Sequence, residues 1–286
     1  MSFSVTEAFV QQYSDNVMLL SQQRGSVVSG AVRVKSGVVG KRTSFERIGA
    51  TSMQARTSRH ADTPLISTPH TRRWANLADY DWADLIDNLD EVKMLISPES
   101  PYAQNAAWAA GRTKDDVILD AIRGTAVTGE EAGGTQALPS GQKVAAASAG
   151  LTLAKIRSAA KILNANEILS EGRFFIINAE SLDDLLGDST ITSADFNAVR
   201  LLMNGEINSF MGFTWLRSQR LDLITGTTRA NLAFHRDGIG LAVGQEVVTR
   251  ISERPDKNYA TQVYLAMSLG AVRVEDEAVV EVAVVE

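Results

Sequence analysis

The chain has 286 residues, 44% of them hydrophobic, which suffices for a substantial core in one large domain or two interlocked ones. It contains no cysteine, so disulfides, thiolate metal sites and cysteine nucleophiles are excluded, and a reducing cytoplasm fits this composition. No window approaches the ~18 uncharged apolar residues of a membrane span, and the N-terminus lacks the pattern of a secretory signal. The formal net charge of −6 argues against a general nucleic-acid binder.

The charge is distributed unevenly along the chain. Residues 24–73 carry ten Lys/Arg and two acids, a net of +8, whereas residues 75–131 carry four Lys/Arg and twelve acids, a net of −8. After Arg273 there are five acids and no base. The basic block could bind nucleic acid, a membrane or an acidic protein surface, or be a solvated loop. Alternatively, it could dock on the acidic face of a neighbouring copy, where complementary charge would steer association and fix register.

The first predicted element is a short amphipathic helix that ends before Gly25. Ser4 and Glu7 form a capping box. Apolar residues follow at helical spacing, at Phe9, Tyr13, Val17 and Leu20. Residues 26–69 come next and are the poorest segment for a core, with many Gly, Ser, Thr and Arg. A loop of this length without its own core should be functional or disordered.

Two helices are expected next. The first carries apolar residues at i, i+3, i+4, i+7 and i+10, namely Trp82, Leu85, Ile86, Leu89 and Val92. The second has Ser100 as its cap and Pro101 at its first position, and it extends to about Val127. Gly111 weakens this second helix by ~1 kcal/mol relative to Ala, so a kink or a close packing contact is expected there.

The middle of the chain predicts a compact α/β subdomain, because helices and strands alternate. Thr128–Ser140 is expected to be a flexible loop. The elements that follow are a helix at Leu153–Asn164, a strand at Phe174–Ile177, a helix capped by Ser181 and Asp184 and stopped by Gly187, a helix from Ser193 to Gly205, and strands at Met211–Leu216 and Leu221–Ile224.

The C-terminal fifth predicts an antiparallel sheet. Gln245–Ser252 alternates with period two, Pro255–Asn258 has turn chemistry, and Tyr259–Leu269 alternates again. A third run, Val272–Val285, is expected to lie behind these two strands.

This series resembles the major capsid proteins of tailed bacteriophages with the Hong Kong 97 fold. The passage from Ala233 onward is similar to their closing segment. Asp84–Gly129, with Gly111-Arg112-x-x-Asp115 in its middle, is similar to their acidic helix, proline-containing break and long spine helix. Leu153–Asn164 followed by Gly172–Asn178 resembles the entry into their apical domain.

The resemblance implies an α+β fold in four parts. These are an N-terminal arm (1–30), an extended hairpin called the E-loop (31–82), a peripheral domain (83–150 and 239–286) with a spine helix at 101–127 and the C-terminal strands, and an α/β axial domain (151–238). Arm and hairpin would lie across a neighbouring subunit. The candidate contact residues are the apolar Phe9, Tyr13, Phe45, Ile48, Leu65 and Ile66, the basic Lys41, Arg42, Arg47, Arg72 and Arg73, and the acidic Asp79, Asp81, Asp84 and Asp87.

The implied function is a shell of pentamers and hexamers that closes into an icosahedral head around double-stranded DNA, without sequence-specific DNA binding. Expected partners are further copies of the chain, with scaffolding, portal and decoration proteins as additional candidates. Because the arm starts almost at Met1, any scaffold should be a separate protein. The expected location is the virion, after assembly in the host bacterial cytoplasm, with no membrane partner.

No catalytic, metal or cofactor site is expected. Gly37–Thr43 resembles a P-loop, but the first Gly would fall at Lys35, and Arg42 stands where a hydroxyl would hold Mg²⁺. Gly238-x-Gly240 lacks the third glycine of a dinucleotide fingerprint. His60 and His70 are too far apart to share a helix face, so a metal would need ligands from elsewhere.

Some relatives join a hairpin Lys to an Asn near the last strands, but neither Lys41 nor Asn258 has a local motif that supports this. Two alternatives stay open: an encapsulin-type compartment shell, which shares the fold, and a soluble α/β enzyme with an unrecognised site.

Overall fold

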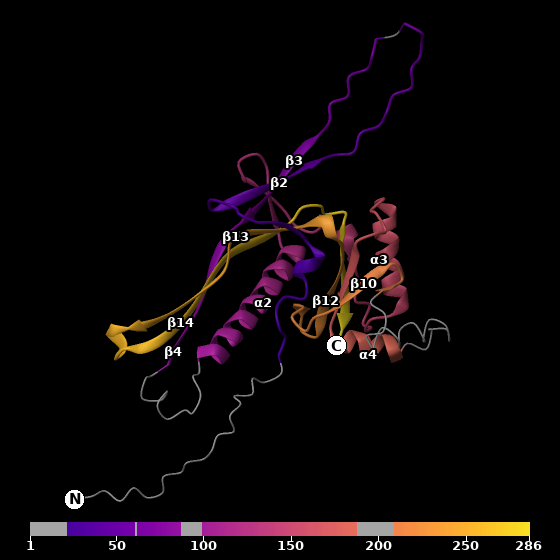
Figure 1. The fold of residues 1–286 in the computed structure, drawn as a ribbon. Coiled ribbons are helices and arrows are strands. Elements are labelled where there is room, and N and C mark those ends of the chain that lie inside the picture. Colours follow the sequence, from indigo (N-terminus) through magenta and orange to yellow (C-terminus); the bar gives the residue numbers. More distant parts are fainter. Residues whose placement is uncertain (1–21, 61, 87–98, 188–208) are drawn as a thin grey trace, which may run out of the picture.

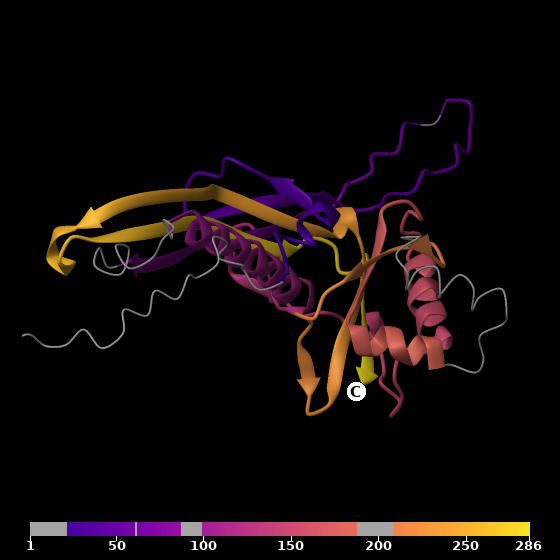
Figure 2. The ribbon, with the colours of Figure 1, turned by 60° about the horizontal axis from the view of Figure 1, so that its bottom comes forward.

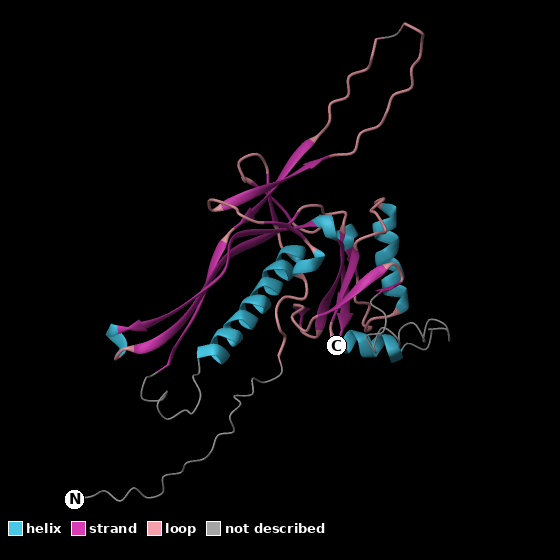
Figure 3. Cartoon of the chain, in the orientation of Figure 1, coloured by secondary structure: helices cyan, strands magenta, loops and turns pink. Residues whose placement is uncertain are grey.

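The computed structural model describes residues 22–60, 62–86, 99–187 and 209–286. It contains two bodies that lie side by side, a long one with a single helix against twisted strands and a shorter one with a sheet and two helices (Figure 1). A hairpin projects from the long body, away from both (Figure 3). The predicted N-terminal helix, with Phe9 and Tyr13, the predicted helix from Ser193, and Asp87 lie outside the described residues.

The long body is built on a four-stranded sheet in the order β1-β13-β14-β4. Its strands are β1 (Arg33–Lys35), β4 (Ala78–Ile86), β13 (Ile239–Arg254) and β14 (Ala260–Arg273). β13 and β14 pair antiparallel along their whole length, from Ile239↔Arg273 to Arg254↔Ala260. Together they form a curved tongue that extends beyond the rest of the body (Figure 2).

Helix α2 (Glu99–Arg123) lies along one face of this sheet (Figure 1). Its buried side chains recur at helical spacing, at Ala106, Ala110, Ile118 and Ile122. They share one core with the period-two residues Leu265, Met267 and Leu269 of β14. The apolar stripe of a helix and the apolar face of a sheet thus cover each other.

A second four-stranded sheet, in the order β2-β3-β5-β6, lies at the root of the hairpin. It comprises β2 (Arg42–Ile48), β3 (His70–Asn76), β5 (Ala126–Thr128) and β6 (Gly134–Gln136). β2 and β3 pair antiparallel from Arg42↔Asn76 to Ile48↔His70. The segment predicted to be a loop at Thr128–Ser140 is largely a small hairpin, because β5 pairs with β6.

The shorter body holds a seven-stranded sheet in the order β7-β15-β12-β8-β10-β9, with β11 paired to β12. Its strands are β7 (Lys143–Val144), β8 (Arg173–Ile177), β9 (Ser209–Phe210), β10 (Phe213–Arg217), β11 (Leu223–Thr225), β12 (Thr228–His235) and β15 (Val279–Val285). Helices α3 (Leu153–Ala165) and α4 (Ala179–Gly187) pack against it, and Phe175 stacks on Trp215 at 4.7 Å in the core between them. Short 3₁₀ turns occupy Ser29–Ala31, Ser140–Gln142, Arg236–Gly238 and Pro255–Lys257.

The structure corrects the predicted helix that begins at Trp82. Residues 78–86 are strand β4, which pairs with β14 from Leu269↔Ala78 to Thr261↔Ile86. Trp82 and Ile86 are four residues apart, a spacing that helical and extended periodicity both place on one face. The edge of β14 decides between them, because an extended chain supplies the backbone partners that this strand needs.

Three further boundaries differ from the prediction. α2 ends at Arg123 and Val127 belongs to β5, because the chain leaves the helix at Gly124. β15 does not extend the β13–β14 sheet but pairs with β12 in the other one. α4 is capped by Asn178, whose Oδ1 accepts from the Ser181 N–H at 3.0 Å, rather than by Ser181.

Candidate assembly surfaces

The outer part of the hairpin, residues 49–69, projects from the subunit and is called the arm from here on, as distinct from the N-terminal arm. A hydrogen bond joins its two ends. Gly49 N donates to Pro69 O at 2.8 Å, directly after the last pair of β2 and β3. Beyond this point the chain runs out and back without assigned strand or helix (Figure 3). Ile48 is 68% exposed and Leu65 96% exposed, and Met53 and Ile66 are also exposed. Apolar side chains on such an extension have little to pack against in their own subunit, which is typical of a contact surface.

The root of the hairpin is held by its own chain. Phe45 is only 5% exposed and packs against Gly240, where an added Cβ would lie 2.7 Å from the Phe45 ring. Phe45 shares a small core with Ala75, Ala126 and Val272. The Phe45 ring is therefore already covered within its own subunit, and its predicted contact with a neighbouring subunit stays a prediction.

A buried ion cluster fastens the same root to the long body. Arg73 Nη2 donates to Asp276 Oδ2 at 2.6 Å, and Arg273 Nε donates to Asp276 Oδ1 at 2.6 Å. The Arg73 side chain is 7% exposed and that of Arg273 is 0% exposed. Arg73 thus has an ion-pair partner within the subunit, and its predicted contact with a neighbouring subunit stays a prediction. Arg47 is partly buried too and donates to Val274 O at 3.2 Å.

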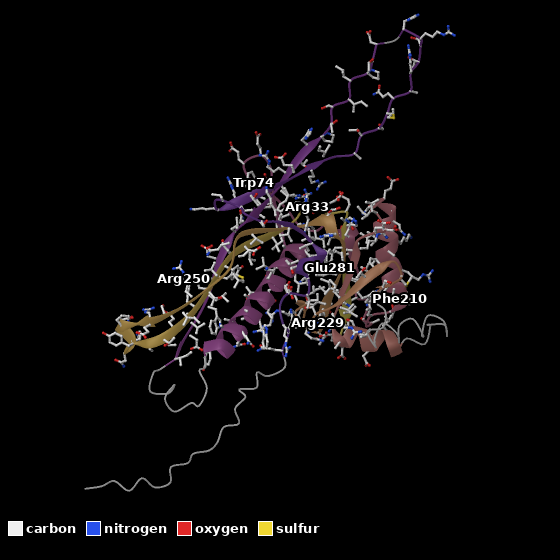
Figure 4. All side chains as sticks on the ribbon, in the orientation of Figure 1. Arg33, Trp74, Phe210, Arg229, Arg250 and Glu281 are labelled. Atoms are coloured by element: carbon white, nitrogen blue, oxygen red, sulfur yellow. The ribbon has the colours of Figure 1, made fainter. Side chains whose placement is uncertain are left out.

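The remaining basic candidates lie on the exposed side of the root. The Arg42 and Arg72 guanidinium carbons lie 4.7 and 5.5 Å from the Trp74 ring centroid. Trp74, labelled in Figure 4, in turn donates Nε1–H to Gly129 O at 2.8 Å. Arg72 also pairs with Glu46 at 2.5 Å, and Lys41 is exposed. These groups remain accessible to a partner at the surface.

Three of the acidic candidates, Asp79, Asp81 and Asp84, lie on strand β4 rather than on one helix face. Asp79 and Asp81 point to one side of the sheet, where Asp81 accepts from the Tyr264 hydroxyl at 2.7 Å. Asp84 alternates to the other side with Trp82. Asp79 and Asp81 are the pair that this geometry brings together.

The Gly111–Asp115 motif holds the start of the described chain. Gly111 meets the backbone of Gly25, and a Cβ there would lie 2.5 Å from Gly25 Cα, so the expected close contact is confirmed. Asp115, one turn along and 0% exposed, accepts from the N–H groups of Val27 and Val28 at 3.0 and 3.1 Å. Gln23 and Ser26 donate to the same carboxylate. This motif therefore fixes where the N-terminal segment leaves the long body.

The other side of α2 faces the shorter body through charged groups. Asp116 pairs with Arg220, and Arg123 donates to Glu281 at 2.9 Å and to Asp222 at 3.0 Å. Figure 4 shows Glu281 between the helix and the sheet. Partial burial, and then the carboxylates of Asp222 and Asp116, raise the pKa of Asp120, which lies between these pairs on the helix.

The chain was compared with known protein families and structures. Its sequence matches the phage capsid protein family over residues 5–286. The chain belongs to this family. As a phage major capsid protein it is a structural subunit of the head shell in the virion, which favours a phage head over a compartment shell.

Solved phage capsids share the fold of this capsid protein. The capsid of cyanophage P-SCSP1u matches with a TM-score of 0.73 at 16% identity, over 98% of this chain and 94% of that chain. The capsid of cyanophage Pam1 matches with a TM-score of 0.72 at 12% identity, over 99% of this chain and 98% of that chain. The structure from Mycobacterium phage Che8 matches with a TM-score of 0.71 at 18% identity, over 96% of this chain and 97% of that chain. A search of curated proteins found no match.

Exposed apolar residues on the tongue of this capsid protein were not among the predicted contacts. Val247, Val248 and Ile251 on β13 and Tyr259 beyond the turn are all partly or largely exposed. Arg250 lies on the same tongue (Figure 4). The sequence signal was present, since a strand longer than its covering helix must leave apolar side chains open.

Two properties of the described residues concern metal ligands and membrane-spanning helices. Residues 22–60, 62–86, 99–187 and 209–286 contain no cluster of three or more metal-ligating side chains. Within those ranges, no helix has the length and apolarity to cross a bilayer.

Proposed function

We propose that the arm formed by residues 49–69 reaches across a neighbouring subunit within pentamers and hexamers. The observation that supports this is the arm itself, closed at its base by the Gly49–Pro69 bond and exposing Leu65, Ile66 and Met53. In an assembled ring these side chains would be buried against the neighbouring subunit. The hydrophobic effect favours this burial, because it removes apolar surface from water. Ile48, at the start of the arm, would join them.

The parts of the subunit then divide as follows. The long body, with α2 as the spine helix, is the peripheral domain, and the shorter body with its seven-stranded sheet is the axial domain near the capsomer centre. β15 pairs within the axial sheet, so we place residues 279–285 there rather than in the peripheral domain. The segment before Gly25, with Phe9 and Tyr13, would extend the interlocking from the Asp115 anchor.

Charge would orient the arm on its neighbour. The arm carries Arg56 and Arg59, both exposed, and the outer side of β4 carries Asp79 and Asp81. Lys41, Arg42 and Arg72 at the root would add to the positive side. Such pairs at a rim steer encounter and register more than they add affinity.

Heterologous contacts of this kind close into rings when the rotation permits. We place the closed shell around packaged double-stranded DNA, without sequence-specific contacts, and its assembly in the host bacterial cytoplasm. Scaffolding, portal and decoration proteins remain candidate partners.

Replacing residues 50–69 with Asn-Gly-Thr tests the arm directly. Gly49 and the residue at position 69 already close a hairpin, and Asn-Gly is the preferred two-residue turn. Threonine takes the place of Pro69 because the turn needs an N–H at this position, which proline lacks. The shortened subunit should fold, as judged by circular dichroism, but negative-stain microscopy should show isolated subunits rather than shells. As a control, a Gly-Ser-rich insertion after Arg59 that doubles the length of the arm should preserve the fold. Normal shells from the shortened subunit would contradict the proposal.

A further inference from the structure

A cavity of about 550 Å³ lies at the root of the hairpin. Its wall is drawn from β2 and β3, from the β5–β6 hairpin, and from the segment after β14, and it includes Arg47, Arg72, Arg73, Thr128, Glu130 and Asp276. Three segments that are distant in sequence therefore meet around one space, and one of them continues directly into the arm.

Two buried guanidinium groups share a single carboxylate at this wall, although Arg273 itself does not line the cavity and Glu46 and Glu130 are also part of the lining. Arg73 and Arg273 share one carboxylate, that of Asp276, and all three side chains are at most 9% exposed. Arg273 is otherwise satisfied, because Nη1 donates to Ile122 O and Gly124 O and Nη2 donates to Gln136 O. Two buried guanidinium groups thus face one carboxylate, where a balanced pair would have two.

Arg73 is the group left incomplete. Its Nη2 is bound to Asp276, but its Nη1 is buried and has no hydrogen-bond partner in the described part of the chain. Burial, together with the charges of Arg47 and Arg273, lowers the pKa of Arg73 from its ordinary value. An unsatisfied N–H on a buried charged group is costly, so the site lacks one acceptor.

Arg47 stands beside the cavity as a second donor. Its side chain is 28% exposed, and the nearest carboxylate, Glu277, lies 3.9 Å away and is half exposed. Arg72, by contrast, is already paired with Glu46 at the outer edge. An incoming acceptor would therefore find two underused guanidinium groups, Arg73 and Arg47.

We infer that this cavity receives a carboxylate side chain from a second copy of the chain. The inference rests on the proposed function, because assembly is what brings a second copy to the root of the arm. A cavity of this size holds a side chain with its adjoining backbone, whereas a free carboxylate would leave most of it to water. The chain also has 34 acids against 28 Lys/Arg, so its own surface supplies the complementary charge.

Arg73→Met tests this with a side chain of similar length and no charge. The free subunit should fold, because Asp276 keeps its bonds to Arg273. The concentration of subunit needed for assembly should rise at least about thirtyfold, as expected when a buried charge pair across an interface loses one partner. Arg72→Met, at the outer edge, is the matched control and should change that concentration much less.

Acetate serves as the probe of the unassembled state. At equal ionic strength, sodium acetate should raise the thermal midpoint of free wild-type subunits relative to sodium chloride, and it should not do so for Arg73→Met. Assembled shells should not respond, because the neighbour's carboxylate already fills the site.

Each outcome is distinguishable. Acetate stabilising free and assembled protein equally would show a free-anion site and overturn the second-copy occupant. Arg73→Met assembling like the wild type, with no acetate response, would overturn the site altogether. Failure of wild-type subunits to form any shell would count instead against the proposed function.

Discussion

At the scale of single residues, two positions one helical turn apart determine how the N-terminal segment meets the spine helix. Gly111 permits backbone contact with Gly25, and Asp115 then accepts hydrogen bonds from the segment that follows. A glycine inside a helix ordinarily weakens it, so its presence here reflects the tertiary contact rather than helix propensity.

Gly111→Ala should therefore destabilise the subunit despite the better helix propensity of alanine. The new Cβ would lie 2.5 Å from Gly25 Cα, and overpacking of this kind costs about 1–3 kcal/mol, more than the ~1 kcal/mol that alanine gains in a helix. Urea unfolding of free subunits measures the difference. Gly141→Ala is the control, because nothing lies within 4 Å of a Cβ there. An unchanged or higher stability of Gly111→Ala would contradict the contact.

At the scale of elements, the junction between α2 and the axial sheet contains carboxyl groups of like charge. Asp120 lies beside Asp116 and Asp222, with Arg123 as the opposing positive charge, and its pKa is raised mainly by partial burial. The folded subunit thus binds this proton more tightly than the unfolded chain does. Its stabilising effect is complete below the ordinary carboxyl value of 3.8 and is lost as pH rises through the raised folded value.

Asp120→Asn should remove the loss of stability that the wild type shows as the pH rises, because an amide does not ionise. The variant should be more stable than the wild type at neutral pH, and the difference should shrink as the pH falls toward the ordinary carboxyl value. Thermal unfolding across this pH range measures it. Asp183→Asn, on the exposed side of α4, is the control and should run parallel to the wild type. A constant offset between Asp120→Asn and wild type would argue against coupled carboxyl groups.

Local sequence patterns predict some of these elements and not others. Period-two runs gave β13 and β14 because both are long and one face is covered, and apolar spacing gave α2 and α3. The spacing of Trp82, Leu85 and Ile86 predicts a helix where the structure has strand β4. Trp82 and Ile86 fit both periods, and pairing with the edge of β14 selects the extended chain.

The assembly surfaces were predictable to a similar extent. The exposed apolar residues of the arm followed from a segment without a core of its own. The partners of Phe45 and Arg73 did not, because Gly240 and Asp276 lie about two hundred residues further along the chain. Local pattern carries no information about such pairings. The role of Asp115 had a local signal in its spacing from Gly111, although its acceptor function needed the fold.

At the scale of the whole molecule, the first quarter of the chain divides between its own subunit and the space around it. In its described part, residues 22–60 and 62–71, Val28, Ala31, Val32 and Phe45 are buried in the subunit, whereas residues 50–60 and 62–69 of the arm are exposed. A deletion of residues 32–73 would therefore remove part of the core, which makes charge changes confined to the arm the sharper test.

Reversing the charge of the arm with Arg56→Glu and Arg59→Glu together should slow assembly at low salt while leaving the fold intact. Both side chains are exposed, and opposite charges at a rim act mainly on the encounter rate. Because salt screens such interactions over roughly 10 Å at 0.1 M, the deficit should diminish as salt increases. Light scattering over a salt series measures it, with Arg56→Lys and Arg59→Lys as the control pair. A deficit independent of salt would exclude steering by the arm.

The position of β15 has a consequence for the integrity of the subunit. β15 lies between β7 and β12 in the axial sheet, but the chain reaches it from β12 only after running through β13 and β14 of the other body. The seven-stranded sheet is therefore completed by a segment that has crossed to the long body and returned. No single cut of the polypeptide would separate the two bodies into independent fragments.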